Sequence, residues 1–262
     1  KLFKFNVKII WHDHYGKSDF LYLRKSLILK FCSYFFYSII SVSRNLKKWS
    51  LENLKCRLVY YIPNFAVLDK INQMNLTKLK GNSGKRIICL ANLRPQKNHL
   101  FLIKIAQRTI INNPDWSFHL VGKDFNDQYS CVLKNEIKKI NLHNNIYIYG
   151  SKSDIYNILQ QSSIGILTSE SEAFPVSVLE YGLAKIPVIT TDVGSIKEII
   201  KHNINGFLIK NNDLESFVLY LQKLINSKCL RENMGKENYE YINNNFSKEI
   251  TIDRILNVYK SE

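Results

Sequence analysis

The sequence predicts an α/β fold built on parallel sheets. Short apolar runs rich in Ile, Val and Phe recur along the 262 residues, and helical stretches with one apolar face lie between them. A polar loop follows almost every apolar run. Strands that alternate with helices in this way form parallel sheets covered by helices. Hydrophobic residues make up 45% of the chain, which is enough for a buried core.

The first 65 residues contain only part of such a fold. Apolar runs predict strands at 7–11, 38–42 and 56–64, with helices at about 21–36 and 43–54 between them. We therefore expect residues 1–65 to form the second half of an amino-terminal domain. The chain starts with Lys1 and soon enters a strand, so we also expect that the beginning of the protein is absent.

Residues 66–84 lack a clear hydrophobic period and end in turn-forming residues, which predicts a linker. From Arg86 the alternation is more regular. Strands are predicted at 86–91, 117–122, 146–150, 164–169, 186–191 and 205–209, with helices at about 98–111, 133–140, 154–161, 176–183 and 195–200. Six such strands predict a complete doubly wound, Rossmann-like domain over residues 85–245. We expect residues 246–262 to form a helix that packs back on the first domain.

Loops that follow the strands of a doubly wound sheet meet in one cleft. One of these loops belongs to "SESEAFPVSVLEYG", residues 169–182. Pro175 stands where the helix begins, so the amides of Val176 and Ser177 lack helical acceptors and can bind an anion. Arg94 and Lys97 in the loop after the strand at 86–91 would face the same cleft. These groups could hold a diphosphate without a metal ion.

Two carboxylates flank this helix start. Glu172 and Glu180 would repel phosphate, but ionised carboxylates accept hydrogen bonds from hydroxyl groups. A diphosphate placed between two polyols, as in a sugar nucleotide, satisfies both sets of residues. The alternative is that Glu180 is a buried capping or salt-bridge carboxylate. Asp124 and Asp127 do not form a D-x-D motif, so we expect no metal site.

Composition restricts the partners and the compartment. The formal net charge of +15 favours anionic partners such as acidic lipid, phosphate-bearing substrates or nucleic acid. The five cysteines include no C-x-x-C pair, which favours a reducing cytosol over a disulfide framework. No signal peptide is visible, and the most apolar run, Phe31–Ser43, is too short to span a bilayer.

The segment "SESEAFPVSVLEYGLAKIPVITTDVGSIKEII" resembles the signature of the retaining GT-B glycosyltransferases, group 1, family 4. Its hallmark is a Glu, seven residues and a second Glu around a Gly-Phe-Pro-like core. The segments "CLANLRPQKNHLFLI", "FHLVGKDF", "IYIYGSKSD" and "HNINGFLIKNND" resemble further landmarks of the family in the same order. The resemblance is dense over residues 85–225 and looser over residues 7–65.

The resemblance implies roles by position. Glu172 would hold hydroxyls of the donor sugar, Glu180 the ribose, and Lys97 the diphosphate and the charge of the leaving group. The loop of Phe174, Pro175 and Val176 would contact phosphate and sugar, and Gly150 and Ser151 would lie near the base. Gly122, in the landmark "FHLVGKDF", would also belong to the substrate site. His12 in "IIWHDH" falls at the position of the family's active-site histidine. His14 is the second choice for that histidine.

Some residues depart from the family pattern. Asn92 stands where Arg is frequent, and Arg94 could supply that charge instead. Ala173 and Lys185 replace frequent glycines. The glycine-rich loop and the strands that open the family's amino-terminal domain have no counterpart here, so we expect an incomplete acceptor site.

The expected function is transfer of a sugar from a UDP- or GDP-type donor to a hydroxyl of a glycan or lipid-linked acceptor. The transfer would retain the configuration of the sugar and would need no metal or other cofactor. Surface polysaccharide synthesis at the cytoplasmic side of an acidic inner membrane surface fits this activity. A sugar-nucleotide epimerase of the same architecture and a non-catalytic nucleotide-sugar-binding fragment are the alternatives. Nucleic acid is not an expected partner, because no interleaved aromatic and basic motif is present.

Overall fold

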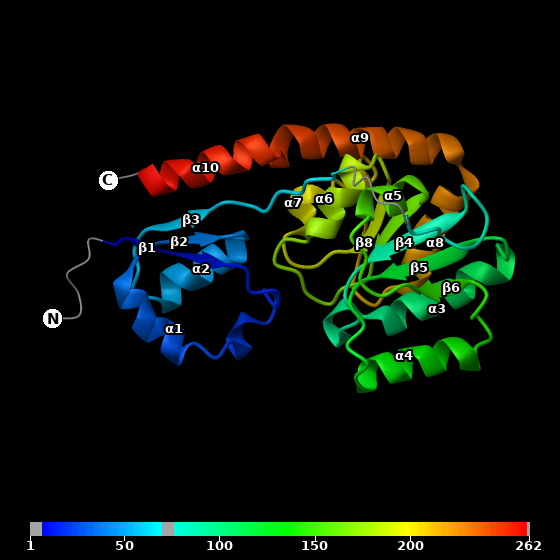
Figure 1. Ribbon diagram of the computed structural model, residues 1–262, viewed down its shortest axis with the longest axis horizontal. Coiled ribbons are helices and arrows are strands. Elements are labelled where there is room, and N and C mark those ends of the chain that lie inside the picture. Colours follow the sequence, from blue (N-terminus) through cyan, green and yellow to red (C-terminus); the bar gives the residue numbers. More distant parts are fainter. Residues whose placement is uncertain (1–6, 70–75, 261–262) are drawn as a thin grey trace.

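The computed structural model describes residues 7–69 and 76–260, and it contains two parallel sheets (Figure 1). The smaller sheet has three strands in the order β1-β2-β3, and the larger has six in the order β6-β5-β4-β7-β8-β9. The order of the larger sheet is that of a Rossmann fold: successive strands are added on one side of β4 up to β6, and from β7 on the other side. The predicted alternation of six strands with helices is therefore confirmed.

The smaller sheet is formed by residues 9–61. Its elements are β1 (Ile9–Asp13), a 3-10 turn (Leu21–Leu23), α1 (Leu27–Cys32), a second 3-10 turn (Ser33–Phe35), β2 (Phe36–Ser41), α2 (Arg44–Asn53) and β3 (Val59–Tyr61). Neighbouring residues of β2 face opposite sides of this sheet. Ile39 packs toward α1 and α2 with Leu54 and Val59, whereas Ile40 packs with Ile62 and Val258 of α10.

Two predictions for this part are wrong in detail. The single helix expected at 21–36 is broken, because Arg24 adopts an extended conformation and its guanidinium pairs with Asp13 at 2.7 Å. Because Arg24 pairs with it, the carboxylate of Asp13 can lie buried at the end of the sheet. The first strand therefore extends to Asp13, and it spans Ile9–Asp13 in place of the expected 7–11.

The larger sheet and its helices are formed by residues 86–209. The elements are β4 (Arg86–Leu90), a 3-10 turn (Pro95–Lys97), α3 (His99–Asn112), β5 (Ser117–Val121), α4 (Gln128–Lys139), β6 (Ile146–Ile148), α5 (Ile155–Gln160), β7 (Ile164–Leu167), α6 (Val176–Leu183), β8 (Val188–Thr191), α7 (Ile196–Ile199) and β9 (Gly206–Ile209). Residues Ile87, Ile88, Phe118 and Ile166 are fully buried, so the sheet is the centre of the main hydrophobic core.

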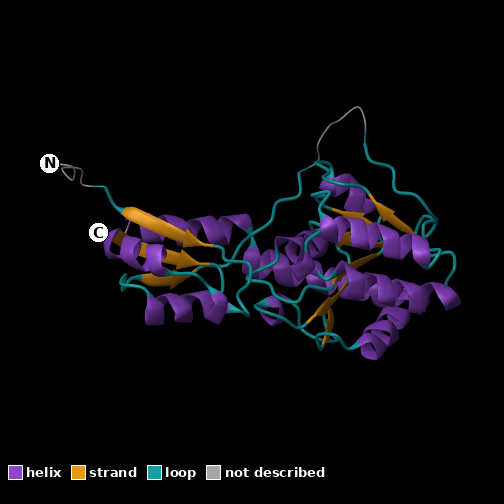
Figure 2. Cartoon of the chain, turned by 90° about the horizontal axis from the view of Figure 1, so that it is seen from below, coloured by secondary structure: helices purple, strands orange, loops and turns teal. Residues whose placement is uncertain are grey.

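Three helices end the chain: α8 (Leu214–Asn226), α9 (Lys228–Phe246) and α10 (Lys248–Lys260). In Figure 1, α9 and α10 run along one side of the molecule from the larger sheet to the smaller one. Near the end of α10, Ile255 and Val258 join the cluster that contains Ile40. Figure 2 shows the strands of both sheets from below, with helices beside them. The C-terminal helices therefore hold the two sheets next to each other.

The later part of the predicted linker is hydrogen-bonded to the two ends of α5. Thr77 Oγ1 donates to Asp154 Oδ1 at 2.9 Å, and the amide of Leu79 donates to Gln161 Oε1 at 3.0 Å. Residues 1–6, 70–75 and 261–262 of the expected ranges lie outside the described residues. Within the described ranges, no helix combines the length and the apolarity needed to cross a membrane.

Candidate active site

A cavity of about 430 Å³ lies between the two sheets, at the carboxyl ends of their strands. Loops after β4, β5 and β7 form one wall, and the loop after β1 approaches from the other sheet. Of the residues predicted from the sequence, the cavity is lined by His14, Asn92, Lys97, Gly122, Glu172, Phe174, Pro175, Val176 and Glu180. The cleft expected from the strand order is therefore present.

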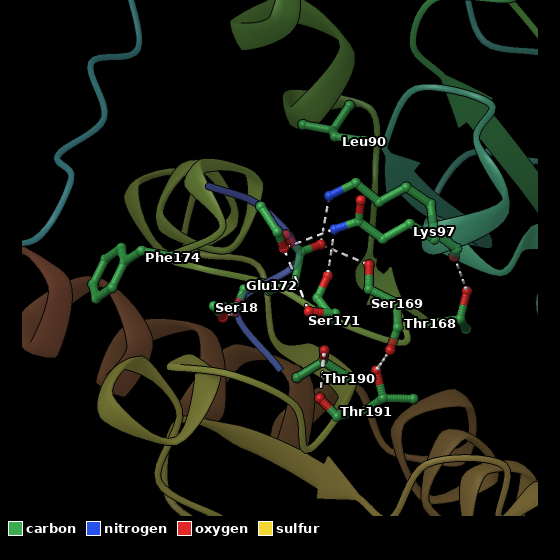
Figure 3. Close-up of polar contacts among 12 residues, drawn as sticks. Ser18, Leu90, Lys97, Thr168, Ser169, Ser171, Glu172, Phe174, Thr190 and Thr191 are labelled. Atoms are coloured by element: carbon green, nitrogen blue, oxygen red, sulfur yellow. Dashed lines mark hydrogen bonds and ion pairs between the residues drawn. The ribbon is translucent and has the colours of Figure 1, made fainter. Parts of the chain in front are cut away.

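Lys97 and Glu172 form an ion pair in this cavity (Figure 3), with Nζ and Oε1 2.5 Å apart. The hydroxyl of Ser169 donates to the same oxygen at 2.6 Å. Glu172 is 5% exposed, and a buried carboxylate needs such partners to remain charged. Lys97 is fixed at its backbone, because the hydroxyl of Thr168 donates to its carbonyl at 3.0 Å.

The loop before α6 presents backbone amides to the cavity. Pro175 is the N-cap of α6 and has an extended conformation, with no side chain capping the helix among the described residues. The amides of Val176 and Ser177 at this helix start are free to bind an anion. The loop is held by Asn64, whose Nδ2 donates to the carbonyl of Phe174 at 3.0 Å.

The loops after β4 and β5 approach each other at Gly122. Its φ is +157°, and a Cβ there would lie 2.2 Å from the carbonyl oxygen of Ala91, so only glycine fits. The Gly122 amide donates to the carbonyl of Gly150 at 3.0 Å, which ties the loop after β6 to this edge. Asn92 Oδ1 accepts from the amide of Lys123 at 2.8 Å. The side-chain oxygen of Asn92 therefore holds the loop after β5 against the loop after β4.

Glu180 is a partly buried carboxylate in α6, and within the described ranges no ion pair joins it to a cation. Burial raises the pKa of Glu180 to about 7, from an ordinary value of 4.5. A carboxylate with this pKa is partly protonated at neutral pH. A ligand that donates hydroxyl hydrogens to Glu180 would favour the ionised form.

The pKa of Glu180 leads to a prediction on stability. Between pH 4.5 and 7 the folded protein holds a proton that the unfolded chain has lost, so stability falls as pH rises through this window. We expect Glu180→Gln to raise the free energy of unfolding at pH 8 by up to about 3 kcal/mol, and to have little effect at pH 4. Denaturant unfolding at both pH values measures this. The exposed Glu170→Gln is the control, and an equal effect of Glu180→Gln at both pH values would contradict the account.

Comparison with known proteins identifies the family. The sequence profile of the glycosyl transferases group 1 family matches residues 75–241, which is more than half of the chain. The chain belongs to this family. The matched residues include Lys97, Glu172 and Glu180, and so the part of the cavity formed by the larger sheet.

Relatives and solved structures agree with the family. The chain is 32% identical over 213 residues to the UDP-Gal:α-D-GlcNAc-diphosphoundecaprenol α-1,3-galactosyltransferase of Escherichia coli, covering 76% of this chain and 53% of that protein. The chain therefore spans about half the length of this relative.

Two solved structures share the fold. HepE of Anabaena, in complex with UDP and glucose, has a TM-score of 0.85 at 18% identity and covers 97% of this chain and 72% of its own. A mutant of S. aureus TarM, in complex with Fondaparinux, α-GlcNAc-glycerol and UDP, has a TM-score of 0.81 at 20% identity. The match covers 98% of this chain and 51% of the TarM chain. These similarities identify the fold as GT-B.

The first-choice histidine, His12, lies outside the lining of the cavity. Its Nε2 lies 2.9 Å from the hydroxyl of Tyr259 in α10. His12 lies inside β1 paired with Ile40, whereas His14 lies beyond the end of the strand and lines the cavity. The two rings stack with centroids 6.3 Å apart. Of the two candidate histidines, His14 is the one that lines the cavity, because the cavity begins where the strand ends.

Three other predicted residues also lie outside the cavity lining. The guanidinium of Arg94 lies outside the cavity lining, 4.7 Å from the centre of the Phe125 ring. Gly150 and Ser151 follow β6 on the adjoining loop, and Ser151 is exposed. Among the described lining residues, Lys97 is the one lysine or arginine. In the described part of the chain, no group of three or more His, Cys, Asp or Glu residues could hold a metal ion.

Sequence reasoning missed two kinds of residue at the cavity. Gly16 and Asn64 line it from the smaller sheet, and Ser169 holds Glu172 from within the motif. The polar turn "HDHYGKSD" directly after the first strand was a visible signal for Gly16 and its neighbours. Its position after a strand end places it in the same cleft.

Proposed function

We propose that this protein transfers a sugar from a UDP-type donor to the hydroxyl of an acceptor. The observation that carries the proposal is the buried Lys97–Glu172 ion pair beside the uncapped start of α6, in a cavity between two sheets. The names of similar proteins support the donor class: the E. coli relative is named for UDP-Gal, and HepE was solved with UDP and glucose.

The cavity provides a separate partner for each part of such a donor. The diphosphate would bind Lys97 and the amides of Val176 and Ser177, where cation and helix start both favour negative charge. The sugar hydroxyls would donate to Glu172, and the ribose hydroxyls to Glu180. The base would lie beside the loop of Gly150 and Ser151.

The Lys97–Glu172 ion pair stabilises the site when no donor is bound. Without a ligand, each charge satisfies the other inside a buried site. A sugar nucleotide offers phosphate oxygens to Lys97 and hydroxyl donors to Glu172. Binding therefore exchanges one ion pair for two sets of ligand contacts and leaves no buried charge unpaired.

We further propose that transfer occurs with retention and without a metal. The bond between the sugar C1 and the phosphate oxygen breaks, and its electron pair stays on the diphosphate. The acceptor oxygen bonds to C1 on the same face, and its proton passes to a diphosphate oxygen. Lys97 and the α6 amides stabilise the charge that develops on the leaving group, which is the role a metal would otherwise have. His14 lies on the opposite wall and would orient the sugar or the acceptor.

The proposed acceptor is a glycan or a lipid-linked glycan used in surface polysaccharide synthesis, at the cytoplasmic face of the inner membrane. The name of the E. coli relative, which specifies a diphosphoundecaprenol acceptor, supports this class. A further support is an apolar surface patch of Tyr22, Leu23, Leu27, Ile28 and Phe31, each at least 64% exposed.

Charge around this patch favours an acidic lipid surface. Residues 20–51 contain no Asp or Glu, whereas Lys25 and Lys30 lie between the residues of this patch in the sequence. Apolar side chains with flanking cations bind at the interface of anionic bilayers. We expect co-sedimentation with phosphatidylglycerol vesicles to exceed that with phosphatidylcholine vesicles, and Phe31→Ser to weaken it.

The matched control for the vesicle experiment is Ile111→Ser, which removes an exposed apolar side chain from α3. Equal binding of the protein to both vesicle types would contradict a role for acidic lipid. Equal loss in the two variants would contradict the role of the patch.

A thermal-shift screen tests the proposed function directly. UDP and UDP-sugars should raise the melting temperature, whereas uridine should raise it much less because it lacks the diphosphate. Incubation with a UDP-sugar alone separates the alternatives. Release of an epimer would support an epimerase, and binding without any turnover, even after an acceptor is supplied, would support a non-catalytic fragment.

A further inference from the structure

A loop from the smaller sheet reaches the segment that carries Glu172. The carbonyl of Gly16 accepts a hydrogen bond from Gln96 Nε2 at 2.8 Å, and the same Nε2 donates to the carbonyl of Ser171 at 2.8 Å. The buried hydroxyl of Ser18 donates to the carbonyl of Glu172 at 2.7 Å (Figure 3). The two halves of the molecule therefore meet at the backbone of Glu172.

The carboxylate of Asp19 is the centre of this contact. Its Oδ2 accepts from the hydroxyl of Ser171 at 2.7 Å and from the amide of Glu172 at 3.3 Å. Its Oδ1 accepts from the amide of Gly194 at 2.9 Å. One ionised side chain of the smaller sheet thus joins two separate loops of the larger one, through charge-assisted hydrogen bonds.

The backbone at Gly194 shows how closely these loops approach. Its φ is +54°, and a Cβ at this position would lie 1.6 Å from the carbonyl oxygen of Glu172. Only a residue without a side chain allows this approach. Asp19 then binds an amide on each side of the junction, which fixes the position of both loops.

We propose that Asp19 is a positioning residue for the sugar end of the donor. It holds the backbone of Glu172 in place, while the side chain of Glu172 is free to exchange Lys97 for sugar hydroxyls. Asp19 acts from the smaller sheet, so the sugar site is complete only when the two halves are closed on each other. This inference rests on the proposed function, because it assumes that Glu172 binds the donor sugar.

The geometry separates this role from diphosphate binding. Lys97 is held by Thr168 and the 3-10 turn before α3, and the α6 amides follow Pro175; Asp19 contacts none of these groups. Loss of the Asp19 carboxylate should therefore displace the sugar partner and leave the diphosphate partners in place. A positional error of about 1 Å in such a group can cost a hundredfold in rate.

Asp19→Asn tests the proposal, because asparagine has a single acceptor oxygen. That oxygen can accept either from Ser171 and Glu172 or from Gly194, and the Nδ2 group on the other side can only donate. Calorimetry compares the affinity for UDP with that for whichever of UDP-glucose, UDP-galactose and UDP-N-acetylglucosamine binds the wild type most tightly. We expect an unchanged Kd for UDP within about twofold. The Kd for the UDP-sugar should rise about tenfold or more. Ser171→Ala, which removes the hydroxyl that donates to Asp19, should give the same pattern: a raised Kd for the UDP-sugar and an unchanged Kd for UDP.

Asp213→Asn is the matched control. This aspartate accepts from the amide of Ser216 at 3.0 Å at the start of α8, outside the cavity. Unchanged affinity of Asp19→Asn for both ligands would overturn the proposal, and so would an equal loss for both, which indicates general damage to the fold. A wild type that binds no UDP would overturn the proposed function as well.

Discussion

Lys97→Ala is expected to weaken UDP binding by at least about tenfold and to reduce sugar transfer further. Lys97 is the one lysine or arginine among the described lining residues, and a buried charge-assisted contact to phosphate contributes about 1.5–3 kcal/mol. The same cation would stabilise the leaving diphosphate, so the loss in rate should exceed the loss in binding. Isothermal calorimetry with UDP and the initial rate of UDP release measure the two effects.

The control for this variant is Lys104→Ala, which removes an exposed lysine from α3, the helix that follows Lys97. Loss of Lys97 also leaves Glu172 without its cation, so the melting temperature of both variants must be compared. Lys97→Met, which keeps the apolar part of the side chain, separates packing from charge. Equal UDP affinity of wild type and Lys97→Ala would contradict the assigned role.

Glu172→Gln is expected to reduce sugar transfer by roughly a hundredfold or more, while the Kd for UDP stays nearly unchanged. The carboxylate would accept hydroxyl hydrogens of the sugar, and a buried group that loses a partner of this kind costs several kcal/mol. UDP has no sugar hydroxyls for Glu172 to bind. Rates of UDP release and calorimetric titration with UDP measure the two quantities on the same preparation.

Glu170→Gln is the matched control, because Glu170 is an exposed carboxylate two residues away on the same loop. It should retain the wild-type rate and the wild-type affinity for UDP. A Glu172→Gln variant with wild-type turnover would show that the sugar lies elsewhere in the cavity. Loss of UDP affinity in Glu172→Gln would instead show that Glu172 accepts a hydrogen bond from UDP itself, such as from a ribose hydroxyl.

The larger sheet was predictable because local pattern and tertiary environment agree there. Strands such as Ile164–Leu167 are buried on both faces and read as continuous apolar runs, and Pro175 marks the start of α6. Strand order then places the loops at one edge. The pairing of Lys97 with Glu172, which are 75 residues apart, follows from that edge and from their opposite charge.

The smaller sheet was less predictable because long-range contacts decide its details. The Arg24–Asp13 ion pair interrupts a segment with a helical pattern, and no local signal specifies that partner. His12 and His14 differ by two residues, yet only the end of β1 determines which of them reaches the cavity. The contacts of Asp19 depend on how the two halves meet, which is a property of the assembled fold.

A crystal structure of the complex with a UDP-sugar tests the central claim most directly. The account predicts that the Lys97–Glu172 ion pair opens, with Lys97 Nζ within hydrogen-bond distance of a diphosphate oxygen and a Glu172 carboxylate oxygen within the same reach of a sugar hydroxyl. The ribose should lie at Glu180. A nucleotide bound outside this cavity, or an ion pair that remains closed beside a bound UDP-sugar, would contradict the account.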